Sequence, residues 1–404
     1  MSFFDPILSP IFAFINLENT IMKMTKLFHI RIAICAFYFA MGWIFASWAS
    51  RIPDIKLALS LSDGDLGTVL FAIPAGQLTM MAISAYLVTR FGSRITLILS
   101  TLMYALILVM ISFSHSFGVL FVSLFFFGAA ANLVNIALNT QACSLEGIYG
   151  RNIMSTFHGL WSLGGLFGGV VGTFFVSTGY AIPIHYISVA FTCLCLICIG
   201  AKYLIKNESS SKSEDKQSKF SLSNLDKAVV LLGLMGFGGM FCEGTVYDWS
   251  AVYFATIVQP EENLVRMGYI AGMGAMTAGR FMADHFVTRY RAITVLKACG
   301  LLITTGLLLT VIFPYLLTAT LGFLLVGFGI SSTIPICYSQ AGKLGTLPAS
   351  IAITIVSSIS FIGFLIGPPL IGFISEATNL RIALGAASVF GLLIICLANI
   401  HSKN

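Results

Sequence analysis

The feature that most limits how this chain can fold is a series of twelve apolar runs, each around 20 residues or longer. They lie near residues 29–50, 64–88, 93–113, 117–143, 153–178, 181–205, 228–257, 265–287, 292–313, 315–341, 349–375 and 380–400. A run of this length crosses a bilayer as a helix, whereas the strands of a membrane barrel are shorter and alternate in polarity. The mean hydropathy of +0.94 agrees with a chain whose solvent is mostly hydrocarbon. The sequence therefore predicts an all-α membrane protein with twelve transmembrane helices.

The second half of the chain repeats the first. A shift of 199 residues superposes matching residues in separate regions: Gly128 on Gly327, Gln141 on Gln340, Gly164 on Gly363. Earlier in each half the best shift is 201, which places Trp48 on Trp249. A repeated membrane unit is typical of secondary transporters. We expect two pseudo-symmetric six-helix bundles.

One polar stretch divides the two halves. Residues 206–227 are rich in Ser, Lys, Glu and Asp, so they cannot bury enough apolar surface to fold alone. The predicted segments are a cytoplasmic N-terminal segment 1–28, a bundle 29–205, a cytoplasmic linker 206–227, a bundle 228–400 and a cytoplasmic tail 401–404.

Basic residues orient the predicted helices. With the N-terminus inside, most lysines and arginines fall on the cytoplasmic side; the exceptions outside are Arg51, Lys56, Arg266 and Arg381. This bias fits the positive-inside rule and places both termini in the cytoplasm. We expect a multi-pass protein of the inner membrane. The net charge of +6 then reflects topology and lipid headgroups, and does not indicate nucleic-acid binding.

The sequence gives little support for an enzyme. It contains no Walker-type phosphate loop, no His and acidic residues at metal spacing and no nucleophile beside a base. Cys193, Cys195 and Cys198 lie in an apolar run, where packing is the simpler interpretation. We therefore predict no cofactor and no metal.

Amide side chains form a stripe on the fourth predicted helix. Asn132, Asn135 and Asn139 follow Gly128 at spacings of 4, 3 and 4, so they share one helix face. Lipid cannot satisfy these amides, although hydrogen bonds between helices could. The stripe favours a wet cavity suited to hydroxyl and amide groups of a sugar-like solute.

The seventh predicted helix carries two carboxyl groups. Glu243 lies near mid-span and Asp248 closer to the outside, with Tyr247 and Trp249 beside them. A carboxyl group in hydrocarbon can bind and release a proton as its access to water changes, which is what proton coupling needs. A permanent hydrogen bond or ion pair is the alternative. No Lys or Arg is expected at mid-span, so of these two alternatives the ion pair has less support than the hydrogen bond.

Other polar side chains are candidates for the same cavity. His158 and Trp161 lie one turn apart on the fifth predicted helix, where His158 is either a cavity residue or a hydrogen-bonding partner of another helix. Tyr338 and Gln340 are the better candidates on the tenth predicted helix.

The loop after the second predicted helix resembles that of the major facilitator superfamily, whose pattern is Gly-x-x-x-Asp-Arg-x-Gly-Arg-Arg. Arg90 and Arg94 match it, whereas Ala85 and Thr89 replace the glycine and the acid. In the repeat, Arg280 and Asp284 are four residues apart and can pair. The resemblance implies a cytoplasmic latch between bundles. The alternative interpretation is that Arg90 and Arg94 only fix the orientation of the helices in the membrane.

A longer stretch resembles a bacterial subgroup near the fucose permeases. The matching elements are Asn139 to Glu146, Gly150-Arg151, Met154-Ser155, Phe157-His158, Ser162-x-Gly164-Gly165 and the segment beginning Asp248-Trp249. Asn135 departs from that pattern, which often has an aspartate there. The resemblance implies the fold of the major facilitator superfamily.

These observations predict a secondary transporter that moves a small polar solute by alternating access, coupled to protons through Glu243. The predicted substrate-binding residues are Asn132, Asn135, Asn139, His158, Trp161, Tyr247, Asp248, Trp249, Tyr338 and Gln340, and the predicted gating residues are Arg90, Arg94, Arg280 and Asp284. We expect a monomer in the lipid bilayer whose partners are the solute and protons. Proton-antiport efflux of amphiphilic compounds and a non-transporting membrane sensor are the alternatives.

Overall fold

The computed structural model describes residues 5–149, 153–206, 227–344 and 349–401. Most of the predicted linker and the last residues of the predicted tail lie outside these ranges. Throughout the described part of the chain the regular structure is helical, with no strand.

The first half of the chain forms seven α-helices, of which α2 is a single short segment. They are α1 (Asp5–Ser50), α2 (Ile52–Ala58), α3 (Asp63–Phe91), α4 (Ser93–Ile111), α5 (Phe117–Tyr149), α6 (Met154–Ser177) and α7 (Ile182–Gly200), followed by the 3₁₀ turn η1 (Ala201–Tyr203).

The second half forms six α-helices in the same order. They are α8 (Lys227–Tyr253), α9 (Met267–Arg289), α10 (Ala292–Ile312), α11 (Leu316–Ala341), α12 (Ala349–Ala377) and α13 (Leu380–His401), with the short segments η3 (Phe254–Val258) and η4 (Glu262–Leu264) between α8 and α9.

The prediction of a twelve-helix membrane fold is confirmed. Within the described ranges, ten helices are long and apolar enough to cross a membrane, and α3 is an eleventh if its bent parts, Asp63–Met81 and Ile83–Phe91, count as one span. The twelfth long helix is α9, which carries Arg280 and Asp284 and is less apolar than the rest. Its polarity reflects the site that it helps to form.

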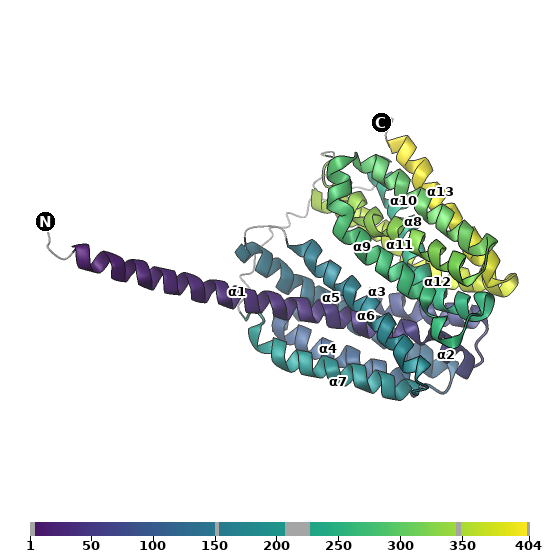
Figure 1. Ribbon diagram of the computed structural model, residues 1–404, viewed down its shortest axis with the longest axis horizontal. Helices are drawn as coiled ribbons and strands as arrows, with labels where there is room; N and C mark the ends of the chain where they lie inside the picture. Colours follow the sequence, from purple (N-terminus) through teal and green to yellow (C-terminus); the bar gives the residue numbers. More distant parts are fainter. Residues whose placement is uncertain (1–4, 150–152, 207–226, 345–348, 402–404) are drawn as a thin grey trace.

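Two groups of helices pack side by side. Helices α1 and α3–α7 pack among themselves, as do α8–α13, and Figure 1 shows both chain ends on the side of the molecule away from α2. Repeat-related glycines lie at equivalent crossings. A Cβ atom on Gly128 would lie 1.9 Å from the Ile73 carbonyl oxygen, and one on Gly327 would lie 2.2 Å from that of Gly272. Only glycine lets these backbones approach so closely.

The two halves meet closely at the end of the molecule that contains α2, which we call the outer end (Figure 1). Arg266 of the second half donates to the Asp54 carboxylate at 2.5 Å and to the Ser50 carbonyl at 2.8 Å. Two further bonds across the halves complete what we call the outer latch: Ser375 to Asp63, and the Gly64 amide to Glu376 at 3.0 Å.

The opposite end, which carries both termini, we call the inner end. Among the side chains that the structure describes, one other hydrogen bond joins the halves, from Arg280 to Ser162 inside the bundle. Figure 1 shows the two groups of helices diverging toward this inner end. The structure is therefore closed at the outer end.

Candidate functional site

A cavity of about 310 Å³ lies between the two halves. This volume falls within the range of roughly 300–1,000 Å³ that small-molecule sites occupy. Helices of both halves supply its wall: Tyr38, Met41, Phe45, Gln77, Tyr104, Ala131, Asn132, Asn135, His158 and Trp161 from the first, and Met240, Glu243, Tyr247, Arg280, Phe361 and Phe364 from the second. The wall combines aromatic rings with a few polar groups.

A buried ion pair forms the polar centre of this wall. Arg280 Nη2 donates to Glu243 Oε1 at 3.0 Å, and the Tyr247 hydroxyl donates to the same oxygen at 2.6 Å. Glu243 and Tyr247 are four residues apart, so both lie on the cavity face of α8. Glu243 is 7% exposed, and its second oxygen makes no hydrogen bond to any residue that the structure describes.

Arg280 also joins the two halves. Its Nη1 donates to Ser162 Oγ of α6 at 2.5 Å, and its Cζ lies 6.0 Å from the centre of the Trp161 ring, within cation–π range. One guanidinium group thus contacts a carboxylate of the second half and a hydroxyl and an indole of the first. A change in the charge of Glu243 would act directly on this bridge.

The expectation that no basic residue lies beside Glu243 at mid-span is wrong, because Arg280 pairs with it. Counting along the chain places Arg280 toward the inner end of α9. Because α9 packs against α8, the long side chain of Arg280 reaches the cavity. The predicted pairing of Arg280 with Asp284 concerns a side chain outside the described residues. The guanidinium of Arg280 donates to Glu243.

The amides of α5 lie as their spacing predicts, along one face. Asn132 and Asn135 line the cavity, and Asn139 donates to Asn135 Oδ1 at 2.5 Å while accepting from the Tyr38 hydroxyl at 2.6 Å. The Oδ1 atom of Asn132 is buried and has no partner in the described part of the protein. It is an acceptor or, with the amide turned over, a donor that a solute could use.

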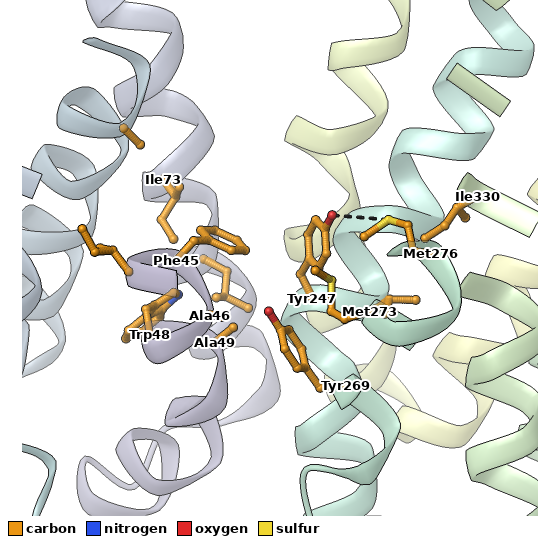
Figure 2. Close-up of a cluster of buried hydrophobic side chains, with 14 of the residues drawn as sticks. Phe45, Ala46, Trp48, Ala49, Ile73, Tyr247, Tyr269, Met273, Met276 and Ile330 are labelled. Carbon is orange, nitrogen blue, oxygen red and sulfur yellow. Dashed lines mark hydrogen bonds between the residues drawn. The ribbon is translucent and has the colours of Figure 1, made fainter. Parts of the chain in front are cut away.

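Aromatic side chains close the remaining wall. His158 is exposed to the cavity and packs edge-on against Tyr38, with ring centres 5.6 Å apart. Figure 2 shows Phe45 and Tyr247 facing each other from the two halves, with 5.5 Å between their ring centres. Trp161 lies 6.1 Å from Tyr247 in a similar edge-on arrangement.

Comparison with known proteins places the chain in a family. The sequence model of the Major Facilitator Superfamily matches residues 32–346, most of the chain. The chain belongs to this superfamily. It is therefore a multi-pass membrane transporter. The predicted membership of the major facilitator superfamily is confirmed.

Relatives of this transporter include Membrane protein MosC of Rhizobium meliloti, which is 30% identical over 366 residues, covering 90% of this chain and 88% of MosC. Two solved structures share the fold. The D-xylose-proton symporter has a TM-score of 0.73 at 13% identity and covers 94% of this chain and 98% of its own. The nucleoside transporter NupG has a TM-score of 0.71 at 11% identity, with 93% and 99% covered.

Five of the ten predicted binding residues are absent from the cavity wall of this transporter: Asn139, which donates to the wall residue Asn135, and four that lie away from the wall. Asp248 and Trp249 are buried next to Tyr247 in sequence, but each residue turns about 100° round the helix, so they point elsewhere. Tyr338 and Gln340 are both half-buried near the inner end of α11. None of the four lines the cavity wall in this state of the transporter.

The two loop arginines differ in their surroundings. Arg90 is exposed at the end of α3, whereas Arg94 Nε donates to the Ala201 carbonyl at 3.1 Å. Arg94 therefore ties α4 to the segment after α7 in its own half. A gating role for either residue stays a prediction.

Several residues that line the cavity of the transporter were not predicted from the sequence. Tyr38 and Phe45, with Met41 between them, are spaced 3 and 4 along α1, a helical face that periodicity could have shown. Phe361 and Phe364 stand in an apolar run where nothing distinguishes them from lipid-facing residues. Ser162 was visible only as part of a motif, not as a partner of Arg280.

Proposed function

We propose that this transporter moves a small uncharged polar solute across the bacterial inner membrane by alternating access, coupled to protons. The observation that carries the proposal is Glu243, a carboxyl group on the wall of a cavity that both halves enclose and that the outer latch closes at one end. In this proposal the protein is a monomer with both termini in the cytoplasm, so the cavity serves the cytoplasmic side in the present state.

The wall of the cavity supports a sugar-like solute. Asn132 and Asn135 offer amide groups, and the flat ring of Trp161 can stack on the apolar face of a sugar or base. Glu243 and Arg280 neutralise each other, so the wall presents no net charge from this pair. Such a lining suits hydroxyl and amide groups on an uncharged molecule. Motifs shared with the subgroup near the fucose permeases, and the names of the two solved relatives, agree with this class.

The geometry of the ion pair supports proton coupling. A proton on Glu243 removes its negative charge and with it the ionic part of the bond to Arg280. Arg280 then remains held to the other half through Ser162 and Trp161. Because one side chain serves both halves, the protonation of Glu243 changes the balance of contacts between them, which is what a switch between two access states requires.

The test begins with a solute. A thermal-shift screen of the purified protein across small-metabolite classes identifies a ligand, because a ligand that favours the folded state raises the melting temperature. In proteoliposomes, Glu243→Gln should abolish accumulation of that ligand driven by a pH gradient while counterflow exchange remains. Glu261→Gln, at an exposed carboxylate of the outer end, is the matched control. Undiminished pH-driven uptake by Glu243→Gln would remove Glu243 from the coupling mechanism.

A second candidate is efflux of amphiphilic compounds by proton antiport. The observation in its favour is the number of aromatic rings on the wall: Tyr38, Phe45, Tyr104, Trp161, Tyr247, Phe361 and Phe364. Cells that produce the protein would then resist the transported compound, whereas uptake would not protect them. Ligand binding without flux in proteoliposomes would indicate a sensor instead.

A further inference from the structure

A second carboxyl group on α8 differs sharply from Glu243 in its surroundings. Asp248 is 5% exposed, and it makes no hydrogen bond or ion pair with any residue that the structure describes. It lies on the outer side of Glu243, below the outer latch, and does not line the cavity. The proposed proton site at Glu243 therefore leaves this carboxyl group without a role.

Three fully buried polar atoms in this outer region have no hydrogen-bond partner among the described residues: Trp48 Nε1, Trp249 Nε1 and the Tyr269 hydroxyl. The Tyr269 hydroxyl lies near Asp248. Figure 2 shows Trp48 in the first half and Tyr269 in the second, with the Tyr269 hydroxyl directed toward Ala49 of α1. Buried polar groups almost always have partners, so a set without them points to groups that find partners in another state.

Among the side chains that the structure describes on the elements around α8, no charged group compensates Asp248. Those groups are engaged with other atoms: Arg266 with Asp54 and Ser50, Arg51 with Asp54, Tyr180 and His185, Lys56 with Asp63, Glu376 with Gly64, Arg381 with the Val311 and Ile312 carbonyls, and Glu243 with Arg280 and Tyr247. On α11, which has no charged side chain, the titratable Cys337 and Tyr338 lie toward the inner end.

An ionised carboxylate that is buried without a partner is far more costly than the neutral acid, because nothing replaces its water. The neutral acid needs no counter-charge. The contacts around Asp248 therefore fit a protonated carboxyl group in this closed state.

We propose that Asp248 is a second proton-binding group, held as the neutral acid while the outer latch is closed and able to release its proton to outer water when the latch opens. The O–H bond of the acid then breaks, water takes the proton, and the carboxylate becomes hydrated. Asp248 and Glu243 are five residues apart on one helix, yet they would exchange protons at opposite ends of the transporter. The use of this proton in transport rests on the proposed proton coupling, whereas its presence on Asp248 does not.

Infrared spectroscopy of the solute-free protein in liposomes tests the protonation directly. The wild-type protein should show the carbonyl-stretch band of a buried neutral carboxyl group at neutral pH. Asp248→Asn should lose this band, and the exposed control Glu261→Gln should keep it. Absence of the band from the wild-type protein, or its persistence in Asp248→Asn, would overturn the proposal.

Two further variants keep the test decisive if Asp248→Asn does not fold. Asp248→Glu keeps an acid at the site and should move the band rather than remove it. Arg266→Gln, which loses the bond to Asp54, should weaken the band at neutral pH because water then reaches Asp248. The proposal is contradicted if the band does not move in Asp248→Glu, or if it keeps its full intensity in Arg266→Gln.

The failure of one proposal can be told from that of the other. Glu243→Gln should leave the band in place, and its loss from this variant alone would assign the proton to Glu243 and overturn the assignment to Asp248. The liposome transport test of Glu243→Gln can fail without any change in the infrared result.

Discussion

Replacement of Arg280 by methionine should destabilise the protein more than any loss of a surface charge. The Glu243 and Arg280 side chains are 10% and 22% exposed, so water screens their interaction only weakly. Methionine removes the cation and leaves the Glu243 carboxylate with one hydrogen bond, from Tyr247. Breaking one side of a buried pair costs about 3–5 kcal/mol. We expect Arg280→Met to fall in that range.

The companion variant separates the pair from other effects of the substitution. When Glu243→Gln is added to Arg280→Met, no uncompensated charge remains, and most of the lost stability should return. We expect a coupling energy of about 2–3 kcal/mol between the two sites, near the upper end of what contacting residues show.

The assay is reversible unfolding of the reconstituted protein by denaturing detergent, followed by circular dichroism or tryptophan fluorescence. Arg291→Met is the matched control, because Arg291 is exposed and its loss should cost within about 0.5 kcal/mol. The reasoning is refuted if Arg280→Met costs no more than this control. It is also refuted if the double variant loses the sum of the two single losses.

Three other predictions concern packing, the latch and the cavity. Gly128→Ala should lower the free energy of unfolding by about 1–3 kcal/mol, because its Cβ would lie 1.9 Å from a backbone carbonyl oxygen of α3. Gly147→Ala, which has open space around it, should not lower the free energy of unfolding in the same assay. Arg266→Gln should increase labelling of Ala49→Cys by a membrane-impermeant thiol reagent added outside, and unchanged labelling would show that the latch does not hold this end. Asn132→Ala should leave the melting temperature of the solute-free protein unchanged, since its Oδ1 has no described partner, but should shrink the shift that a bound solute causes.

The sequence by itself determined the architecture of this transporter. Runs of about 20 apolar residues can satisfy their backbone groups in lipid only as helices, so the order and approximate bounds of the spans follow from the positions of those runs in the sequence. The internal repeat then grouped those helices into two bundles, and Gly128 and Gly327 mark equivalent close crossings in each. The amide stripe of α5 was also readable, because helical period places Asn132 and Asn135 on one face whatever the surroundings.

Only the tertiary structure decided which side chains meet. Arg280 and Glu243 are 37 residues apart, and Arg266 and Asp54 are 212 apart, so no local period relates them. Asp248 was expected in the cavity with Tyr247 but is buried away from it. The physical reason is that the backbone sets the angle between neighbouring residues on one helix, whereas the rotation of that helix against its neighbours is set by the packing of all of them together.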